Sequence, residues 1–133
     1  MVVEGPVISK RTYSPGGGVQ NDIALRVTGV LKGSGVSAGD TILIHVPGGY
    51  AGSDHTCWQD TISDGARVEV GTTYLVLLTK EAETKYYRGV GLASFFRISH
   101  TGSVIPLTPA LVRNHVFSGQ KIADFEARAK ALP

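Results

Sequence analysis

The chain has 133 residues, of which 42% are hydrophobic and 18% are charged, which is typical of one globular domain and excludes a disordered chain. Its formal net charge is only +2, and its 13 basic and 11 acidic residues are scattered, so no basic tail for nucleic acid or membranes is present. The single cysteine, Cys57, excludes an intrachain disulfide, and no run of about 18 apolar residues predicts a membrane-spanning helix.

The first residues already have the pattern of a strand. Residues 2–12 read as β-structure, with Gly5-Pro6 at a bulge or an edge position. Because a natural domain usually begins with a few loose residues, we expect a segment cut from a longer precursor whose leader has been removed. This predicts a location outside the cytoplasm: secreted, periplasmic or on the cell surface.

Three further segments predict the barrel core. In Asp22–Lys32 apolar and polar residues alternate, which is typical of a half-buried strand. In Thr41–Val46 the apolar residues are again in phase, while Thr72–Thr79 is apolar throughout and predicts a central strand. The residues expected to be buried are Leu25, Val27, Ile42, Ile44, Leu75, Leu77 and Phe125.

The second half of the chain predicts one bent strand, one hairpin and one helix. Residues 85–99 read as a long strand bent at Gly89 and Gly91, and the turn at 100–103 leads into another strand. The spacing of apolar residues predicts a helix over about 119–132, with Ser118 as its N-cap. The 17 glycines fit many tight turns. Together these patterns predict a single all-β domain over residues 1–133, an OB-like five-stranded Greek-key barrel with one C-terminal helix, the alternative being a β-sandwich.

A family resemblance follows from the order of these strands and turns. The residues that carry it are Val30-Leu31-Lys32-Gly33, Asp40-Thr41-Ile42-Leu43-Ile44, Pro47-Gly48-Gly49, Val70-Gly71-Thr72-Thr73-Tyr74-Leu75-Val76-Leu77-Leu78, Tyr86-Tyr87, Gly91 and Phe96-Arg97-Ile98. Over roughly residues 2–107 the chain resembles poorly characterised bacterial exported OB-like domains. More distantly it is similar to the netrin-like domain of tissue inhibitors of metalloproteinases. These inhibitors chelate zinc through an N-terminal cysteine, whereas this chain starts Met1-Val2-Val3, so the resemblance does not imply that activity.

The long polar segment 49–70 is the candidate binding site. A loop of about twenty residues is uncommon in a compact domain and is often functional. It contains the large aromatic residues Tyr50 and Trp58, which are common at recognition hot spots, and the polar His55. We therefore expect Tyr50, His55 and Trp58 to bind a partner, the alternative being a loop that only caps the barrel.

The same loop holds the densest group of chemically active residues, Asp54-His55-Thr56-Cys57-Trp58-Gln59-Asp60. His55 and Cys57 suit a thiolate–imidazole pair or two metal ligands, but a structural zinc site needs a second ligand pair, which is missing. The expected outcome is a polar loop pinned by Trp58, with no catalytic residue, no metal and no cofactor. The other histidines, His45, His100 and His115, are dispersed and are expected to be solvent-facing or hydrogen-bonded polar residues.

These patterns favour one function over two alternatives. The leading hypothesis is a non-catalytic, extracytoplasmic interaction or structural domain with a protein partner. One alternative is a single-stranded nucleic-acid-binding OB domain, because Tyr86, Tyr87, Arg88 and the Phe95-Phe96-Arg97 run combine aromatic and basic residues, although the low net charge argues against it. Another alternative is a subunit of an extracellular assembly, joined through an edge strand.

Overall fold

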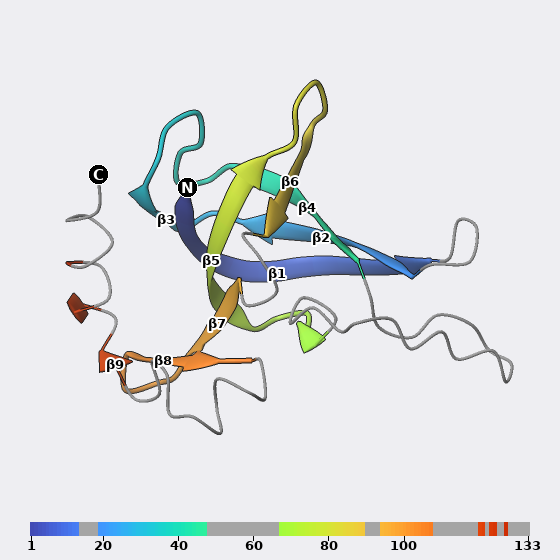
Figure 1. The fold of residues 1–133 in the computed structure, drawn as a ribbon. Coiled ribbons are helices and arrows are strands. Elements are labelled where there is room, and N and C mark those ends of the chain that lie inside the picture. The colour runs from blue at the N-terminus through green and yellow to red at the C-terminus, as the bar shows by residue number, and fades with distance from the viewer. Residues whose placement is uncertain are drawn as a thin grey trace, which may run out of the picture.

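The computed structural model describes residues 1–13, 19–47, 67–89, 94–107, 120–121, 123–124 and 127. Within these ranges the chain forms nine β-strands (Figure 1). In chain order they are β1 (Val2–Tyr13), β2 (Gln20–Arg26), β3 (Gly29–Lys32), β4 (Thr41–Pro47), β5 (Thr73–Lys80), β6 (Tyr86–Gly89), β7 (Phe95–Ile98), β8 (Ser103–Pro106) and β9 (Gln120–Lys121).

Five of the strands close into a barrel. β1 pairs with β2 and β2 with β4, both antiparallel, and β4 pairs with β6 in parallel. β6 then pairs antiparallel with β5, and β5 pairs antiparallel with β1, which closes the ring. The order around the ring differs from the chain order, since β6 lies between β4 and β5. The prediction of an all-β, five-stranded Greek-key barrel is confirmed, and the sandwich alternative is not.

β1 belongs to two parts of the sheet because it changes partners along its length. Its first residues lie between β3 and β5, and from Val7 onward it pairs with β2. At the crossover a Cβ atom on Gly5 would overlap the backbone carbonyl oxygen of Arg26, so only glycine fits there. The register of β1 is irregular on either side of Gly5-Pro6: between Val2 and Val3 in its pairing with β3, and between Val7 and Ser9 in its pairing with β2.

The barrel interior follows the predicted alternation. Ile23, Leu25 and Val27 are fully buried in the main core, and Ile42 and Ile44 join them from β4. From β5, Tyr74 packs edge-on against Phe95 with ring centroids 6.0 Å apart. Alternate side chains of neighbouring strands thus fill the barrel, as expected of a small closed sheet.

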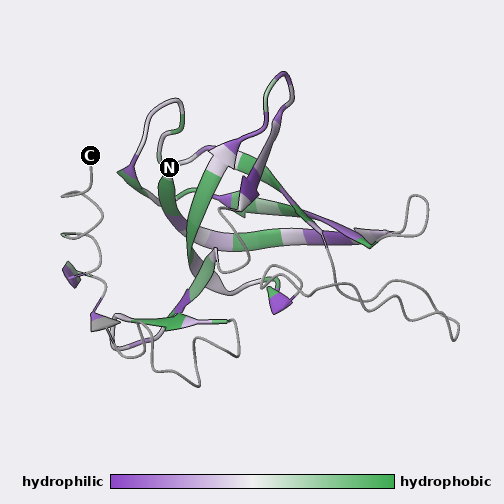
Figure 2. Cartoon of the chain, in the orientation of Figure 1, coloured by the Kyte–Doolittle hydropathy of each residue, from purple (hydrophilic) through white to green (hydrophobic). Residues whose placement is uncertain are grey.

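A second apolar cluster explains why β5 has no polar face. Leu75 is fully buried outside the main core, in a cluster with Val2, Phe96 and Val104. Leu77 also packs against this cluster but is only half-buried, so the expectation that it is fully buried was too strong. Figure 2 shows β5 coloured as apolar along most of its length and β6 as mostly hydrophilic. A strand covered on both sides reads as a continuous apolar run.

The predicted long strand is divided into β6 and β7. Both pair with β5, but Leu78 is opposite Gly89 whereas Val76, only two residues away, is opposite Phe95. The predicted hairpin at 100–103 is confirmed: β7 and β8 pair antiparallel, and Gly102 has a φ of 75° in the turn between them. The pairings with β5 place the two halves of the predicted strand in different parts of the sheet.

The predicted C-terminal helix is not confirmed along its length. Gln120 and Lys121 form β9 and pair with Val104 and Ser103 of β8, so the segment does not begin as a helix at 119. Residues 123, 124 and 127 are helical, and the rest of the predicted helix, with Phe125 and Ser118, lies outside the described residues. An apolar stripe predicts helical periodicity but does not define the first residue, and here Gln120 and Lys121 pair with β8 instead.

Candidate functional site

The predicted partner-binding residues lie outside the described part of the chain. Tyr50, His55 and Trp58 belong to residues 48–66, for which no structure is described, and so does Cys57. The structure therefore leaves the loop prediction untested. His100 lies exposed in the β7–β8 turn, and His115 is outside the described residues. His45 is the histidine around which the structure assembles a polar cluster.

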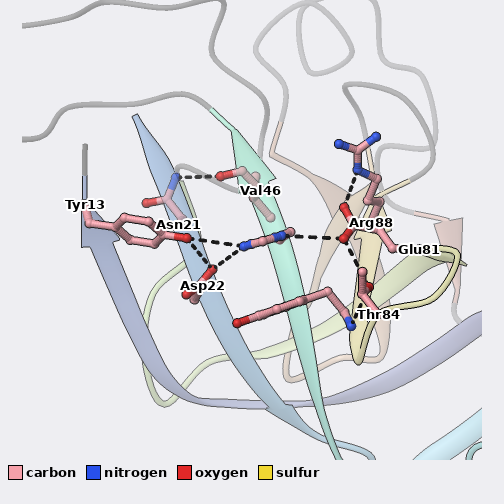
Figure 3. Close-up of polar contacts among 9 residues, drawn as sticks. Tyr13, Asn21, Asp22, Val46, Glu81, Thr84 and Arg88 are labelled. Carbon is pink, nitrogen blue, oxygen red and sulfur yellow. Dashed lines mark hydrogen bonds and ion pairs between the residues drawn. The ribbon is translucent and has the colours of Figure 1, made fainter. Parts of the chain in front are cut away.

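His45 lies at the centre of this cluster, between Asp22 and Glu81. Figure 3 shows the polar contacts that connect Tyr13, Asp22, Glu81 and Arg88 through this cluster. Its Nε2 atom is 2.8 Å from Oδ1 of Asp22, and its Nδ1 atom is 3.7 Å from Oε2 of Glu81. The hydroxyl of Tyr13 lies 3.3 Å from both His45 Nε2 and Asp22 Oδ1. Both ring nitrogens thus face acceptor or hydroxyl groups of neighbouring elements.

Glu81 connects this cluster to the β5–β6 turn. Its Oε1 atom is 2.6 Å from Nε of Arg88, and its Oε2 atom accepts a hydrogen bond of 3.3 Å from the Thr84 hydroxyl. The Thr84 hydroxyl oxygen in turn accepts a 3.1 Å hydrogen bond from the backbone N–H of Tyr86. The turn is therefore tied to the outer surface of β4 and β6 through one carboxylate.

Aromatic and cationic side chains cover the same surface. The His45 and Tyr86 rings are stacked, with centroids 4.0 Å apart and planes only 4° from parallel. The Lys85 ammonium lies 5.6 Å from the Tyr86 ring centroid, and the Arg11 guanidinium lies 4.8 Å from that of Tyr13. We call the surface formed by Tyr13, Asp22, His45, Glu81, Tyr86 and Arg88 the His45 face.

Strand alternation and register explain how these side chains meet. His45 lies between the buried Ile44 and Val46, so its side chain points outward. In the register of the sheet, Asp22 is directly opposite His45, and His45 is directly opposite Arg88. Directly opposite residues in a sheet have neighbouring side chains on the same face, and two pairings therefore bring residues from three separate segments close together.

A buried asparagine holds the strands beneath this surface. Asn21 is only 1% exposed, and its Nδ2 atom donates a 3.1 Å hydrogen bond to the carbonyl of Val46. Its Oδ1 atom accepts a 2.7 Å hydrogen bond from the Thr12 hydroxyl. Because Thr12 is on β1, Asn21 on β2 and Val46 on β4, this amide connects three neighbouring strands.

Two side chains near this end of the barrel, Tyr13 and Lys10, have pKa values shifted by their surroundings. Desolvation, and after it the charge and hydrogen bond of Asp22, raises the pKa of the Tyr13 phenol above its ordinary value. Burial lowers the pKa of the Lys10 ammonium, partly offset by the charge of Glu69, while its Nζ donates a 3.2 Å hydrogen bond to the carbonyl of Val68. The phenol of Tyr13 is thus held in its neutral form.

Both ring nitrogens of His45 are occupied by contacts within the chain. A general base needs a ring nitrogen directed at the group it deprotonates, whereas both nitrogens of His45 contact side chains of the chain itself. The two carboxylates lie at opposite ring nitrogens and do not converge on one point. Among the described residues, no group of histidine, cysteine and acidic side chains has the arrangement to hold a metal ion.

The aromatic and basic residues of 86–97 are separated by the fold. Tyr86 and Arg88 belong to the His45 face, Phe95 is in the barrel core, and Phe96 is in the second cluster. Arg97 is exposed on β7. Sequence reasoning names Tyr86 and Arg88 only as part of a possible nucleic-acid surface and expects His45 to be solvent-facing or hydrogen-bonded. It misses Tyr13, Asp22 and Glu81, because no short motif links positions 13, 22, 45, 81, 86 and 88.

Among the residues that the structure describes, no helix is both long and apolar enough to cross a membrane. Comparison with protein-family models, curated proteins and solved structures found no match to the chain.

Proposed function

We propose that this chain is a non-catalytic binding domain that recognises a protein partner through the His45 face. The observation that carries the proposal is the cluster itself: charged and aromatic side chains from five separate elements are linked into one ordered surface. A preorganised surface loses less side-chain entropy when a partner binds, and tyrosine and arginine are enriched among the residues that dominate binding energy.

The strand order supports an OB-like assignment and the choice of surface. In chain order, the five barrel strands are β1, β2, β4, β5 and β6. The third of them, β4, and the fifth, β6, are adjacent and parallel. OB barrels bind ligands on the surface of their second and third strands and on the loop between the fourth and fifth. Here those positions correspond to Asp22, His45 and Glu81. The resemblance to exported bacterial domains adds the proposal that the domain works outside the cytoplasm.

Two carboxylates at the centre of the surface favour protein over nucleic acid. Asp22 and Glu81 flank His45, and Arg88 is already paired with Glu81. Phosphate backbones need concentrated positive charge, which this surface does not offer. A mixture of carboxylate, guanidinium and aromatic groups is instead typical of protein interfaces.

The test selects ligands from a phage-displayed random peptide library on the immobilised domain. Peptides that are enriched are then measured by fluorescence polarisation against wild type, the double variant Tyr86→Ala/Arg88→Ala, and a control, Arg97→Ala/His100→Ala. The control removes one exposed basic and one exposed aromatic residue from β7 and its turn. Thermal unfolding of every variant verifies folding.

We expect the Tyr86/Arg88 variant to weaken binding by about tenfold or more, and the control to leave binding unchanged. Equal weakening by both variants, or no enrichment of any peptide, overturns the proposal. Salt-sensitive binding of oligothymidylate that exceeds binding of every peptide overturns it in favour of a nucleic-acid function.

A further inference from the structure

A groove opens beside the His45 face, at the end of the barrel where the β3–β4 loop and the β5–β6 turn emerge. Figure 1 shows these two connections at the same end of the barrel. Two adjoining hollows of about 520 and 400 Å³ form the groove, and Gly35, Lys80 and Tyr87 line both. Leu78 lies in the first hollow, and Leu43 and Lys85 lie in the second.

One wall of the groove is a loop with a defined shape. Gly35 has a φ of 85°, a left-handed conformation that other residues rarely adopt, and a Cβ there would meet nothing within 4 Å. The Asp40 carboxylate accepts a 2.9 Å hydrogen bond from the N–H of Ser37, and the N–H of Gly39 donates to the carbonyl of Val27. The loop is therefore held against β2 before any ligand arrives.

The other wall carries two lysines held at the groove. The Lys80 ammonium is 4.5 Å from the Tyr87 ring centroid, and that of Lys85 is 5.6 Å from the ring centroid of Tyr86. Neither forms an ion pair with another described residue. Glu81 lies between them in sequence, but its carboxylate contacts Arg88 and His45 instead.

The floor of the first hollow is mainly apolar. Leu78 lies fully buried beneath it, and Met1 and Tyr87, which line it, are half-buried. The acidic residue that lines the second hollow is Asp40, whose carboxylate is hydrogen-bonded to Ser37. The groove thus combines an apolar floor in the first hollow with two cations that lack a carboxylate partner among the described residues.

We propose that this groove binds an acidic peptide segment of a partner protein, with one apolar side chain on the floor and carboxylates beside Lys80 and Lys85. The inference rests on the proposed function, because it names the chemistry of the partner that the neighbouring His45 face recognises. Charge complementarity identifies the occupant: a segment of opposite charge is attracted to the two lysines, and its apolar residue covers the exposed part of Tyr87 in the first hollow.

The experiment uses the full chain and four fluorescent probes. The first is a decapeptide with glutamates around a single leucine, the second replaces each glutamate by lysine, and the third replaces the leucine by serine. The fourth is an oligothymidylate of similar length. The protein variants are Lys80→Glu/Lys85→Glu and the charge-matched control Arg97→Glu/Lys121→Glu, whose positions are exposed on β7 and β9.

We expect only the acidic, leucine-containing peptide to bind wild type, and binding to weaken at higher salt. Lys80→Glu/Lys85→Glu is expected to reduce its affinity by about tenfold or more, while the control retains it. Because all four substituted positions are exposed, the variants are expected to remain folded. Their thermal unfolding midpoints verify this.

Three results overturn the inference: no binding of the acidic peptide at millimolar concentration, equal loss of affinity in the control, or tighter binding of oligothymidylate. Failure here is distinguishable from failure of the proposed function. If peptides selected from the random library depend on Tyr86 and Arg88 but not on Lys80 and Lys85, the His45 face binds a partner and the groove does not.

Discussion

The barrel interior and the His45 face are made by neighbouring residues of the same strand, yet they are organised by different rules. On β4, Ile44 points inward and is fully buried, while the next residue, His45, points outward into the polar cluster. Interior residues need only to be apolar and of suitable size. The residues of the His45 face depend on defined atom pairs between β1, β2, β4, β6 and the β5–β6 turn.

The difference separates the residues expected to govern stability from those proposed to bind a partner. Burial of apolar surface is non-directional, and it contributes in proportion to the area removed from water. Ion pairs at a partly exposed surface contribute little to stability because water screens them, but they hold side chains in place. The interior is therefore expected to dominate unfolding, and the His45 face is expected to dominate binding.

The largest effect on the free energy of unfolding is expected from truncating buried apolar side chains. Ile44→Ala should lower the free energy of unfolding by about 2–5 kcal/mol, because it leaves a cavity in a fully buried position. Leu75→Ala should cost a similar amount in the second cluster. Urea denaturation measures both, with Thr41→Ala at an exposed position as the control. A loss below about 0.5 kcal/mol at Ile44 would contradict the assignment of the core.

The bend in β1 is the next most sensitive point. In Gly5→Ala the added methyl group overlaps the Arg26 carbonyl, so the strand crossover must shift, at a cost of about 3 kcal/mol. Gly35→Ala is the control, because its methyl group meets no atom and only the backbone conformation is strained, at about 1–2 kcal/mol. Thermal or urea unfolding compares the two, and a smaller loss for Gly5→Ala than for Gly35→Ala would refute the close approach.

The buried amide beneath the His45 face offers a direct connection between the two regions. Asn21→Leu should cost about 1–3 kcal/mol, because the carbonyl of Val46 loses its hydrogen-bond donor in a buried site. Thr12→Val removes only the hydroxyl at the other end of the amide and should cost less. Denaturant titration gives both values, and a neutral Asn21→Leu variant would show that this hydrogen bond does not support the surface.

The smallest effect on stability is expected from the titration of Tyr13 at alkaline pH. Because the folded chain raises the pKa of Tyr13, its stabilising contribution is complete below the unfolded value of about 10 and is lost as pH rises through the folded pKa. The lowered pKa of Lys10 acts in the opposite direction in the alkaline range. Denaturation of wild type and Tyr13→Phe between pH 8 and about 11 isolates the tyrosine. The same pH slope for both proteins would contradict its coupling to Asp22.

Much of the fold was predictable because it depends on local patterns. The alternation of Ile23, Leu25 and Val27 identified an inward face, and Gly102 marked the β7–β8 turn. The continuous apolar run of β5 indicated a central strand but did not show that its two faces join different clusters. The start of the predicted helix was wrong because Gln120 and Lys121 pair with β8, a contact with residues far away in the sequence.

The apolar positions, the alternation within strands and the turns between them follow from the amino-acid sequence alone, because these properties depend on neighbours a few positions apart. The neighbourhood of Asp22, His45 and Arg88 follows only from the folded chain, because strand register depends on the pairing of distant segments. The same holds for Glu81, which reaches His45 because β5 and β6 close the barrel. Barrel closure therefore assembles the His45 face from residues that share no motif.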